Sequence, residues 1–208
     1  PSRAAPCGRG LAVVHTKYES TNVSLVNWEG EVLSSSFISS ATGGAKLSAK
    51  LSGDVVLPTA DVNGNELVLL DRYPASVLTW VDVKSAKVES QLSVRSGFQA
   101  NPHDYLELGP SRAYVTRFEK NPDPAASSLD KGDDVLVVDP TVPRVTGSID
   151  LSAAMADAGA GFRAAPHRLA RAGARVYASL LGESTAWAPA PSRLVELDPK
   201  SDTLGQVL

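Results

Sequence analysis

The sequence predicts an all-β protein of the β-propeller class, built of four-stranded antiparallel blades, of which about four are present. Short runs of β-branched, aromatic and leucine residues alternate with turn residues along the chain, which is the signature of strands. One such run ends in an aspartate that recurs at Asp82, Asp139 and Asp198, at intervals of 57 and 59 residues. A repeat of this size made of short strands is typical of propeller blades, because each small sheet buries its faces only against its neighbours.

The third repeat shows the four expected strands most clearly. A first strand is expected over residues 104–108 and a second over 112–118, where the sequence reads Arg-Ala-Tyr-Val-Thr-Arg-Phe. After a loop, the third strand is expected over 134–140 and the fourth over 145–151. Each run is bounded by Gly, Pro, Asn, Asp or Ser, which favours strands over helices.

The other repeats follow the same order when they are aligned on the closing aspartate, with Asn27 in that position of the first repeat. Repeat one lacks a first strand ahead of Leu11, and residues 152–158 are expected to form a short helix with a serine cap and a glycine stop. The predicted blades cover residues 8–40, 53–96, 103–152 and 166–208 of one propeller domain, or part of one. Their expected second and third strands are 11–18 and 23–27, 67–73 and 77–82, and 176–181 and 193–198.

The third repeat resembles the YVTN-repeat β-propellers, a family of the seven-bladed type. The resemblance rests on Ala113-Tyr114-Val115-Thr116, then Val135 to Asp139, then Val145 and a Gly-Ser-Ile strand. It covers nearly the whole chain, but it is close only in the third repeat. It implies a propeller fold and an extracytoplasmic location in the periplasm, at the cell surface or in the medium, as for bacterial secreted proteins, and it leaves the function open.

The chain begins without Met and stops inside an expected fourth strand, so we expect four blades of a ring of about seven, with a four-bladed ring as the alternative. Cys7 is the only cysteine, which excludes an internal disulfide. It could carry a lipid anchor, pair with a cysteine beyond this segment or be a free thiol. Pro6 argues against the anchor, since lipid-attachment boxes prefer a small residue there.

Composition restricts the partners. The chain is 43% hydrophobic and 21% charged with a net charge of −3, which gives no electrostatic reason to expect nucleic acid. No apolar run reaches the roughly 18 residues that a membrane span needs. The oligomeric state cannot be inferred from the sequence.

Comparison of the repeats yields two sets of candidate site residues. Lys17, Arg72 and Arg117 occupy the same position at the end of the second strand, where they could bind an anionic ligand at one end of the blades. The alternative is that each cation lies over the aromatic residue that follows it and solvates the surface. His103 and His167 both follow a proline that leads into a first strand, and they could face each other as metal ligands or as acid and base.

Carboxylates are expected to be structural. Asp82, Asp139 and Asp198 each precede a turn. We expect each carboxylate to accept hydrogen bonds from the backbone amides of its turn. The acidic segment 130–134 lacks the spacing of a calcium loop and contains a lysine. A metal at the histidines would need a third ligand, and His15 lies in a second strand at a different level. We therefore expect no metal and no cofactor.

Two functions remain open. No catalytic or nucleotide-binding motif is present, so the first hypothesis is a non-catalytic extracytoplasmic binding or scaffold protein that recognises a protein, peptide or glycan. Its loops at 121–128 and 186–192 would form the recognition surface. The alternative is a lactonase-like hydrolase or lyase at the channel mouth, in which Arg72 and Arg117 hold an oxyanion and His103, with His167 nearby, moves a proton.

Overall fold

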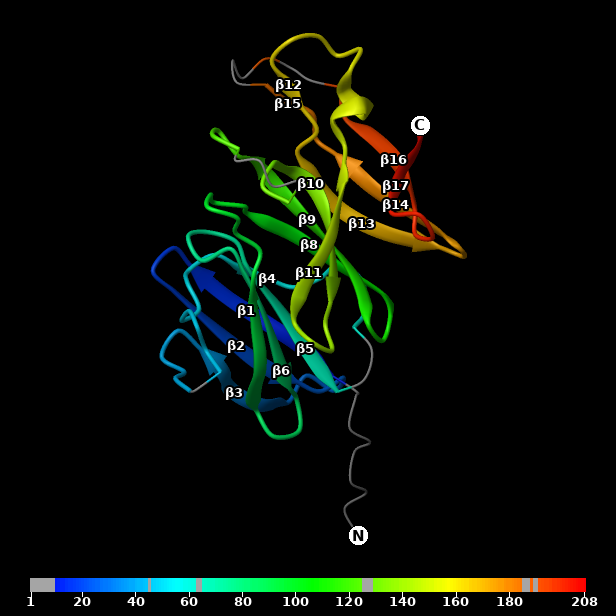
Figure 1. The fold of residues 1–208 in the computed structure, drawn as a ribbon. Coiled ribbons are helices and arrows are strands. Elements are labelled where there is room, and N and C mark those ends of the chain that lie inside the picture. The colour runs from blue at the N-terminus through cyan, green and yellow to red at the C-terminus, as the bar shows by residue number, and fades with distance from the viewer. Residues whose placement is uncertain (1–9, 45, 63–64, 125–128, 185–187, 189–190) are drawn as a thin grey trace. The chain divides into compact units, whose positions relative to one another are not determined.

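The computed structural model is all-β and describes residues 10–44, 46–62, 65–124, 129–184, 188 and 191–208 (Figure 1). The chain divides into two compact units. The first unit contains residues 1–57 and 62–93, and the second unit contains residues 58–61 and 94–208. The four predicted blades correspond to four antiparallel sheets, two in each unit. Whether all four belong to one domain stays a prediction.

The first unit contains a three-stranded and a four-stranded sheet. The first sheet has the order β1-β2-β3, with β1 at Leu11–Lys17, β2 at Ser20–Val26 and β3 at Val32–Ser39. As predicted, the first repeat has no first strand within its described residues. The second sheet has the order β4-β5-β6-β7, with these strands at Val55–Val56, Glu66–Asp71, Val77–Asp82 and Lys87–Ser93.

Burial explains these strand sequences. The central strands β5 and β6 are buried along almost their whole length, so both of their faces are apolar, whereas β7 alternates between exposed and half-buried residues. This pattern is expected where the central strands of a small sheet are covered on both faces and its edge strand is less covered. Apolar side chains from both sheets form one core in the first unit: Val23, Ile38, Leu51, Val55, Leu69 and Val81.

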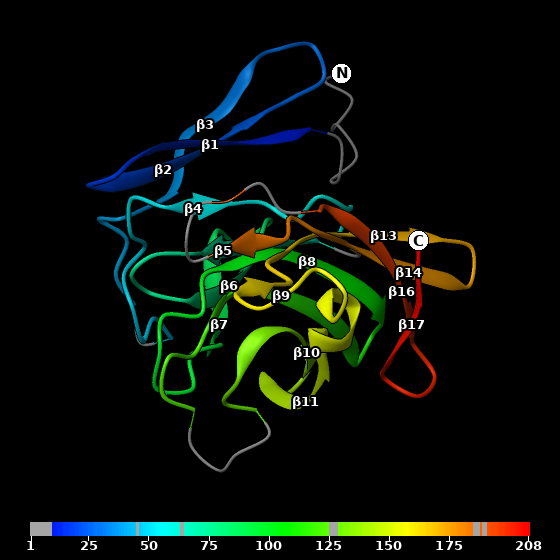
Figure 2. The ribbon, with the colours of Figure 1, turned by 90° about the horizontal axis from the view of Figure 1, so that it is seen from above.

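The second unit contains two complete four-stranded sheets (Figure 2). In one, β8 to β11 lie side by side in chain order at Pro102–Gly109, Arg112–Lys120, Gly132–Asp139 and Arg144–Asp150. The other has the order β13-β14-β16-β17, at Pro166–Ala172, Arg175–Leu180, Arg193–Asp198 and Thr203–Val207. A small extra sheet, absent from the sequence prediction, pairs β12 (Phe162–Arg163) with β15 (Glu183–Ser184).

Polar contacts join the two sheets of the second unit. Asp104 is completely buried, and its carboxylate accepts hydrogen bonds from the amide of Thr59 at 2.8 Å and the amide of Leu169 at 2.8 Å. At the other end, Asp202 accepts a hydrogen bond from the hydroxyl of Tyr114 at 2.6 Å and forms an ion pair with Arg112. These contacts fix the register of one sheet against the next.

The predicted short helix is present in a reduced form. It is a 3₁₀-helix, η1, at Ser152–Met155, with Leu151 as its N-cap and Ala156 as its C-cap, so the predicted serine cap and the glycine stop at Gly159 are both wrong. Ser152 lies inside the helix, and its amide donates to Asp150 at 2.8 Å. The turn exists because Ala154 and Met155 pack into the core of the second unit, which outweighs the weak helical preference of so short a segment.

Candidate functional site

The predicted site residues lie at one end of the sheets, which we call the rim. It is the end at which a second strand finishes and a first strand begins. In an antiparallel blade these two points are adjacent, because the first and second strands run in opposite directions. The pairing of Pro102 with Arg117, and of Pro166 with Leu180, places Arg117, His103 and His167 at the rim of the sheets of the second unit.

His103 and His167 meet at this rim. Their ring centroids are 5.0 Å apart with an angle of 64° between the planes. His103 also stacks on Phe118, with ring centroids 4.5 Å apart and an angle of 12°. The residues before the two prolines, Asn101 and Ala165, both have positive φ angles, of 49° and 46°. The two repeats therefore share an unusual backbone conformation two residues before each histidine.

Arg163 contacts three acidic residues around this aromatic cluster. Its guanidinium lies 4.8 Å from the centre of the Phe118 ring, donates to the backbone oxygen of Phe118 and pairs with Glu183 and, at 3.1 Å, with Glu119. It also lies 3.6 Å from Asp133. Burial raises the pKa of Asp133, while hydrogen bonds from the amides of Ala165 and Ala164 and the nearby Arg163 oppose that rise. Three carboxylates at this rim therefore share the one guanidinium of Arg163.

A cavity of about 170 Å³ opens beside Phe118. Its lining is mixed, with the apolar residues Phe118 and Leu181 and the polar residues Glu183 and Ser184. The remaining lining residues are Gly182 and Ala188. Leu181 is 44% exposed, so the cavity has an accessible apolar wall. Its lining does not include His103, His167 or Arg117.

Arg117 lies in the interior of the second unit. Its side chain is 0% exposed and forms a two-bond ion pair with Asp134, with Nε 2.7 Å from Oδ1 and Nη2 2.6 Å from Oδ2. Its other donors reach the backbone oxygen of Leu129 at 2.8 Å and the hydroxyl of Ser96 at 3.2 Å. It lies over the ring of Phe98 at 5.2 Å, whereas the sequence suggested the following Phe118. These contacts favour a structural role, and ligand binding by Arg117 stays a prediction.

Lys17 and Arg72 lie at the rim of the first unit. Arg72 pairs with Asp54, to which its Nε donates at 2.9 Å, and its side chain is 30% exposed. Lys17 is exposed at the end of β1. Each cation is followed by an exposed tyrosine, Tyr18 at 99% and Tyr73 at 61%. The repeat position that holds Phe118 and Leu181 in the second unit therefore holds exposed aromatic residues here.

The turn aspartates are confirmed as structural. The backbone amides of Ser85, Thr141 and Lys200 donate to Asp82, Asp139 and Asp198 at 2.6, 3.0 and 2.8 Å. In each case hydrogen bonds from the turn lower the pKa of the carboxyl group.

The carboxylates of the acidic segment 130–134 also have partners in the protein. Asp130 accepts from Asn121 at 3.1 Å, and Asp133 accepts the amides of Ala164 and Ala165 at 2.9 and 2.6 Å. Within the described ranges, no group of three His, Cys, Asp or Glu side chains could hold a metal ion. In the same part of the chain, no helix is long and apolar enough to cross a membrane.

Some predicted features lie outside the described residues. These are Cys7, residues 125–128 of the predicted recognition loop 121–128, and residues 186, 187, 189 and 190 of the loop 186–192. The base of the first loop is described, and it is tightly bonded. Asn121 donates to the backbone oxygen of Asp130 at 2.8 Å, and the amide of Asn121 donates to Lys131 at 2.8 Å.

Solved structures provide an independent comparison of the fold. The chain is similar over 100% of its length to the β-propeller domain of Cps50 (Swd1) from Myceliophteria thermophila, with a TM-score of 0.57 and 13% identity. The chain has a β-propeller fold. At this identity the likeness shows the fold alone, and the chain spans 57% of that domain.

Further matches have lower TM-scores and carry no argument. Glutaminyl cyclase of Myxococcus xanthus matches with a TM-score of 0.45 and 15% identity over 92% of this chain and 71% of that one. KlAtg21, in a complex with the coiled-coil of AgAtg16, matches with a TM-score of 0.49 and 13% identity. This match covers 98% of this chain and 53% of that one. No family model matches the sequence. No curated protein matches it either.

Sequence reasoning identified the histidine pair but missed Arg163, Glu183 and the cavity. Arg163 and Glu183 belong to β12 and β15, the small extra sheet, and two-residue strands leave no periodic signal. The repeat alignment did contain a signal for the exposed aromatic residues. The position after Lys17, Arg72, Arg117 and Leu180 holds Tyr18, Tyr73, Phe118 and Leu181.

Proposed function

We propose that the protein is a non-catalytic binding or scaffold β-propeller that acts outside the cytoplasm and recognises a protein, peptide or glycan through its rim. The observation that carries this proposal is the accessible cavity beside Phe118, whose apolar wall includes the exposed Leu181. Concave sites with an apolar wall and a few polar groups are where propellers and other rigid frames bind ligands.

The geometry favours binding over the hydrolase or lyase alternative. That alternative requires an arginine and a histidine that converge on one pocket. In the second unit, Arg117 is buried in its pair with Asp134, and His103 is stacked on Phe118. Neither residue lines the cavity.

The location and the family belong to the proposal as well. The resemblance of the third repeat to YVTN-repeat propellers supports an extracytoplasmic bacterial protein. Expression of the natural reading frame, followed by fractionation into cytoplasm, periplasm, membrane and medium, tests the location.

The binding proposal is tested with two matched variants of exposed apolar residues. Leu181→Asp places a charge in the cavity wall. Val142→Asp places the same charge in the β10–β11 turn, at the opposite end of its sheet, where Val142 is 62% exposed. Immobilised wild-type protein is incubated with an envelope extract and with culture fluid, and captured proteins and glycans are identified by mass spectrometry and then tested as purified ligands.

We expect Leu181→Asp to weaken binding of the purified ligand at least tenfold and Val142→Asp to leave it within twofold, because truncating or charging an interface centre costs more than 1.4 kcal/mol. Equal binding by both variants, or capture of nothing by the wild type, would contradict the proposal.

A test of the predicted recognition loop, residues 121–128, must shorten it without removing the contacts at its base. Deleting all of residues 119–133 would remove Asp133 and the oxygen of Leu129, which hold Arg163 and Arg117. Replacement of residues 123–128 by two glycines leaves those contacts in place. Loss of ligand binding at unchanged thermal stability would assign recognition to the loop, and unchanged binding would exclude it.

A further inference from the structure

We propose that the rim of the first unit is a second binding site, formed by Tyr18 and Tyr73, and that it takes a neutral glycan. Tyr18 is 99% exposed and Tyr73 is 61% exposed. A single exposed aromatic side chain needs no explanation. Here two exposed tyrosines occupy the same position of adjacent repeats, and we call the surface that they form with Ser52 and Gly53 the platform.

The two tyrosines are neighbours across Ser52 and Gly53. The hydroxyl of Ser52 lies 2.7 Å from the backbone oxygen of Tyr73, and Gly53 packs directly against the backbone of Tyr18. A Cβ atom at Gly53 would overlap the carbonyl group of Tyr18 and would come within 2.6 Å of the amide of Glu19. The close approach therefore requires glycine at this position.

The backbone under both rings is held by hydrogen bonds. Thr16 donates to the oxygen of Gly53, and Thr21 donates to the oxygen of Ser52 at 2.7 Å. The amide of Ser52 donates to the buried carboxyl group of Asp71 at 2.7 Å. A ligand that binds here therefore does not have to order the backbone that carries the two rings.

The charges around the platform cancel. Arg72 is paired with Asp54, and the exposed Lys17 and Glu19 flank Tyr18 on its two sides. A charged ligand would find no surplus of the opposite charge, so the surface is complementary to a neutral ligand.

The chemistry matches a sugar. A tyrosine ring offers a flat apolar body and a polar hydroxyl group, which suits the carbon face and the hydroxyl groups of a pyranose. The ion pair of Arg72 with Asp54 is partly exposed, at 30% and 25%, and offers a donor and an acceptor side by side for neighbouring hydroxyl groups. This site lies in the first unit and is independent of the cavity in the second unit.

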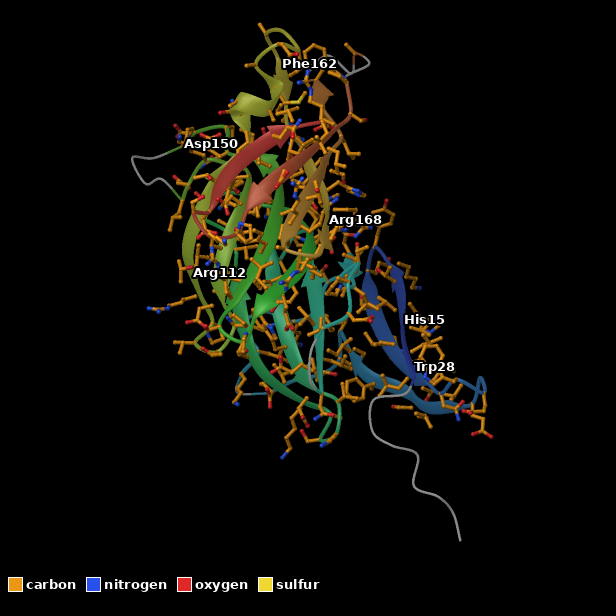
Figure 3. All side chains as sticks on the ribbon, turned by 90° about the vertical axis from the view of Figure 1, so that its right-hand side faces the viewer. His15, Trp28, Arg112, Asp150, Phe162 and Arg168 are labelled. Atoms are coloured by element: carbon orange, nitrogen blue, oxygen red, sulfur yellow. The ribbon has the colours of Figure 1, made fainter. Side chains whose placement is uncertain are left out.

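The test uses the whole chain and neutral hexasaccharides as probes: β-1,4-glucan, β-1,3-glucan, α-mannan and β-1,4-linked N-acetylglucosamine. Binding is measured by calorimetry for the wild type, Tyr18→Ala, Tyr73→Ala and Tyr18→Phe. The matched control is Trp28→Ala. Trp28, labelled in Figure 3, is 64% exposed in the β2–β3 turn at the opposite end of the same sheet.

We expect at least one hexasaccharide to bind, with affinity reduced five- to tenfold by each alanine variant and changed less than twofold by Tyr18→Phe and Trp28→Ala. Tyr18 is exposed and Tyr73 forms its hydrogen bond to Ser52 through the backbone, so neither alanine variant is expected to unfold. Absence of binding to all four probes would overturn the proposal.

Two other results would also overturn it. One is binding that Trp28→Ala abolishes and Tyr18→Ala does not. The other is tyrosine-dependent binding of only a proline decamer or an anionic oligosaccharide, included as competing probes. Failure of the Leu181→Asp experiment leaves this result untouched, because that variant changes the other unit.

Discussion

The buried ion pair of Arg117 with Asp134 permits a quantitative prediction. The side chains are 0% and 4% exposed, and two charge-assisted hydrogen bonds of 2.7 and 2.6 Å join them. Removing one partner of such a pair costs about 3 to 5 kcal/mol, because the other charge stays buried without compensation. We expect Asp134→Asn to lower the free energy of unfolding of the second unit by about 4 kcal/mol.

The two single substitutions should differ in their pH dependence. Arginine cannot lose its proton at accessible pH, so Arg117 stays charged and unpaired in Asp134→Asn at every pH between 5 and 8. In Arg117→Met, the remaining Asp134 can take up a proton. Burial raises the pKa of this carboxyl group, and Arg117 opposes that rise in the wild type. The cost of Arg117→Met should therefore be largest at neutral pH and fall as the pH decreases.

The double variant Arg117→Met with Asp134→Asn completes the cycle of the two single variants and measures the coupling between the two side chains. The double variant should recover about half of the unfolding free energy that a single substitution removes, and no more. The reason is that the backbone oxygen of Leu129 and the hydroxyl of Ser96 also lose the donor that Arg117 provides. Stability is measured by hydrogen exchange of peptides from β9 and β10, since two units need not unfold together. A loss below about 1 kcal/mol in Asp134→Asn would refute this account of the pair.

Three further predictions concern single residues. Burial raises the pKa of Asp71 above its unfolded value of about 3.9. The stabilising contribution of Asp71 is therefore complete below about pH 4 and is lost as the pH rises through the folded pKa. In urea titrations, Asp71→Asn should remove this dependence of the unfolding free energy on pH, and an unchanged dependence would contradict the prediction. Gly53→Ala should cost about 2 kcal/mol by overlap with Tyr18, whereas Gly43→Ala, with no atom within 4 Å of its Cβ position, should leave the melting temperature unchanged. Burial and the hydrogen bond to Asp202 raise the pKa of Tyr114, so ultraviolet titration of the wild type and Tyr114→Phe should coincide near pH 10, and a difference there would count against the buried position.

Much of the fold followed from local patterns. The aspartates at the ends of the third strands recur because each turn needs an acceptor for its own amides, and this requirement involves only two or three residues in sequence. The strands were predicted to within a few residues because burial of a narrow sheet imposes apolar runs of limited length. The serine cap at Ser152 failed because packing of Ala154 and Met155, and not capping, determines that turn.

The candidate site was predictable only in part. The repeat alignment placed Lys17, Arg72 and Arg117 at one position, and His103 and His167 at another, and the structure brings the two histidines within 5.0 Å. Their surroundings were not predictable. Arg117 is buried and Arg72 is partly exposed because only Arg117 meets a carboxylate in the interior, 17 residues further along the chain.

The sequence by itself determined the repeat, the order of strands in each blade and the end of the blade at which chemically active side chains gather, because these depend on neighbours within one repeat. Tertiary structure alone decided which of those side chains are buried, paired or exposed. A charge that is identical in three repeats faces Asp134 and Phe98 in one and solvent in another, and the free energy of burying a charge depends on partners that no local pattern specifies.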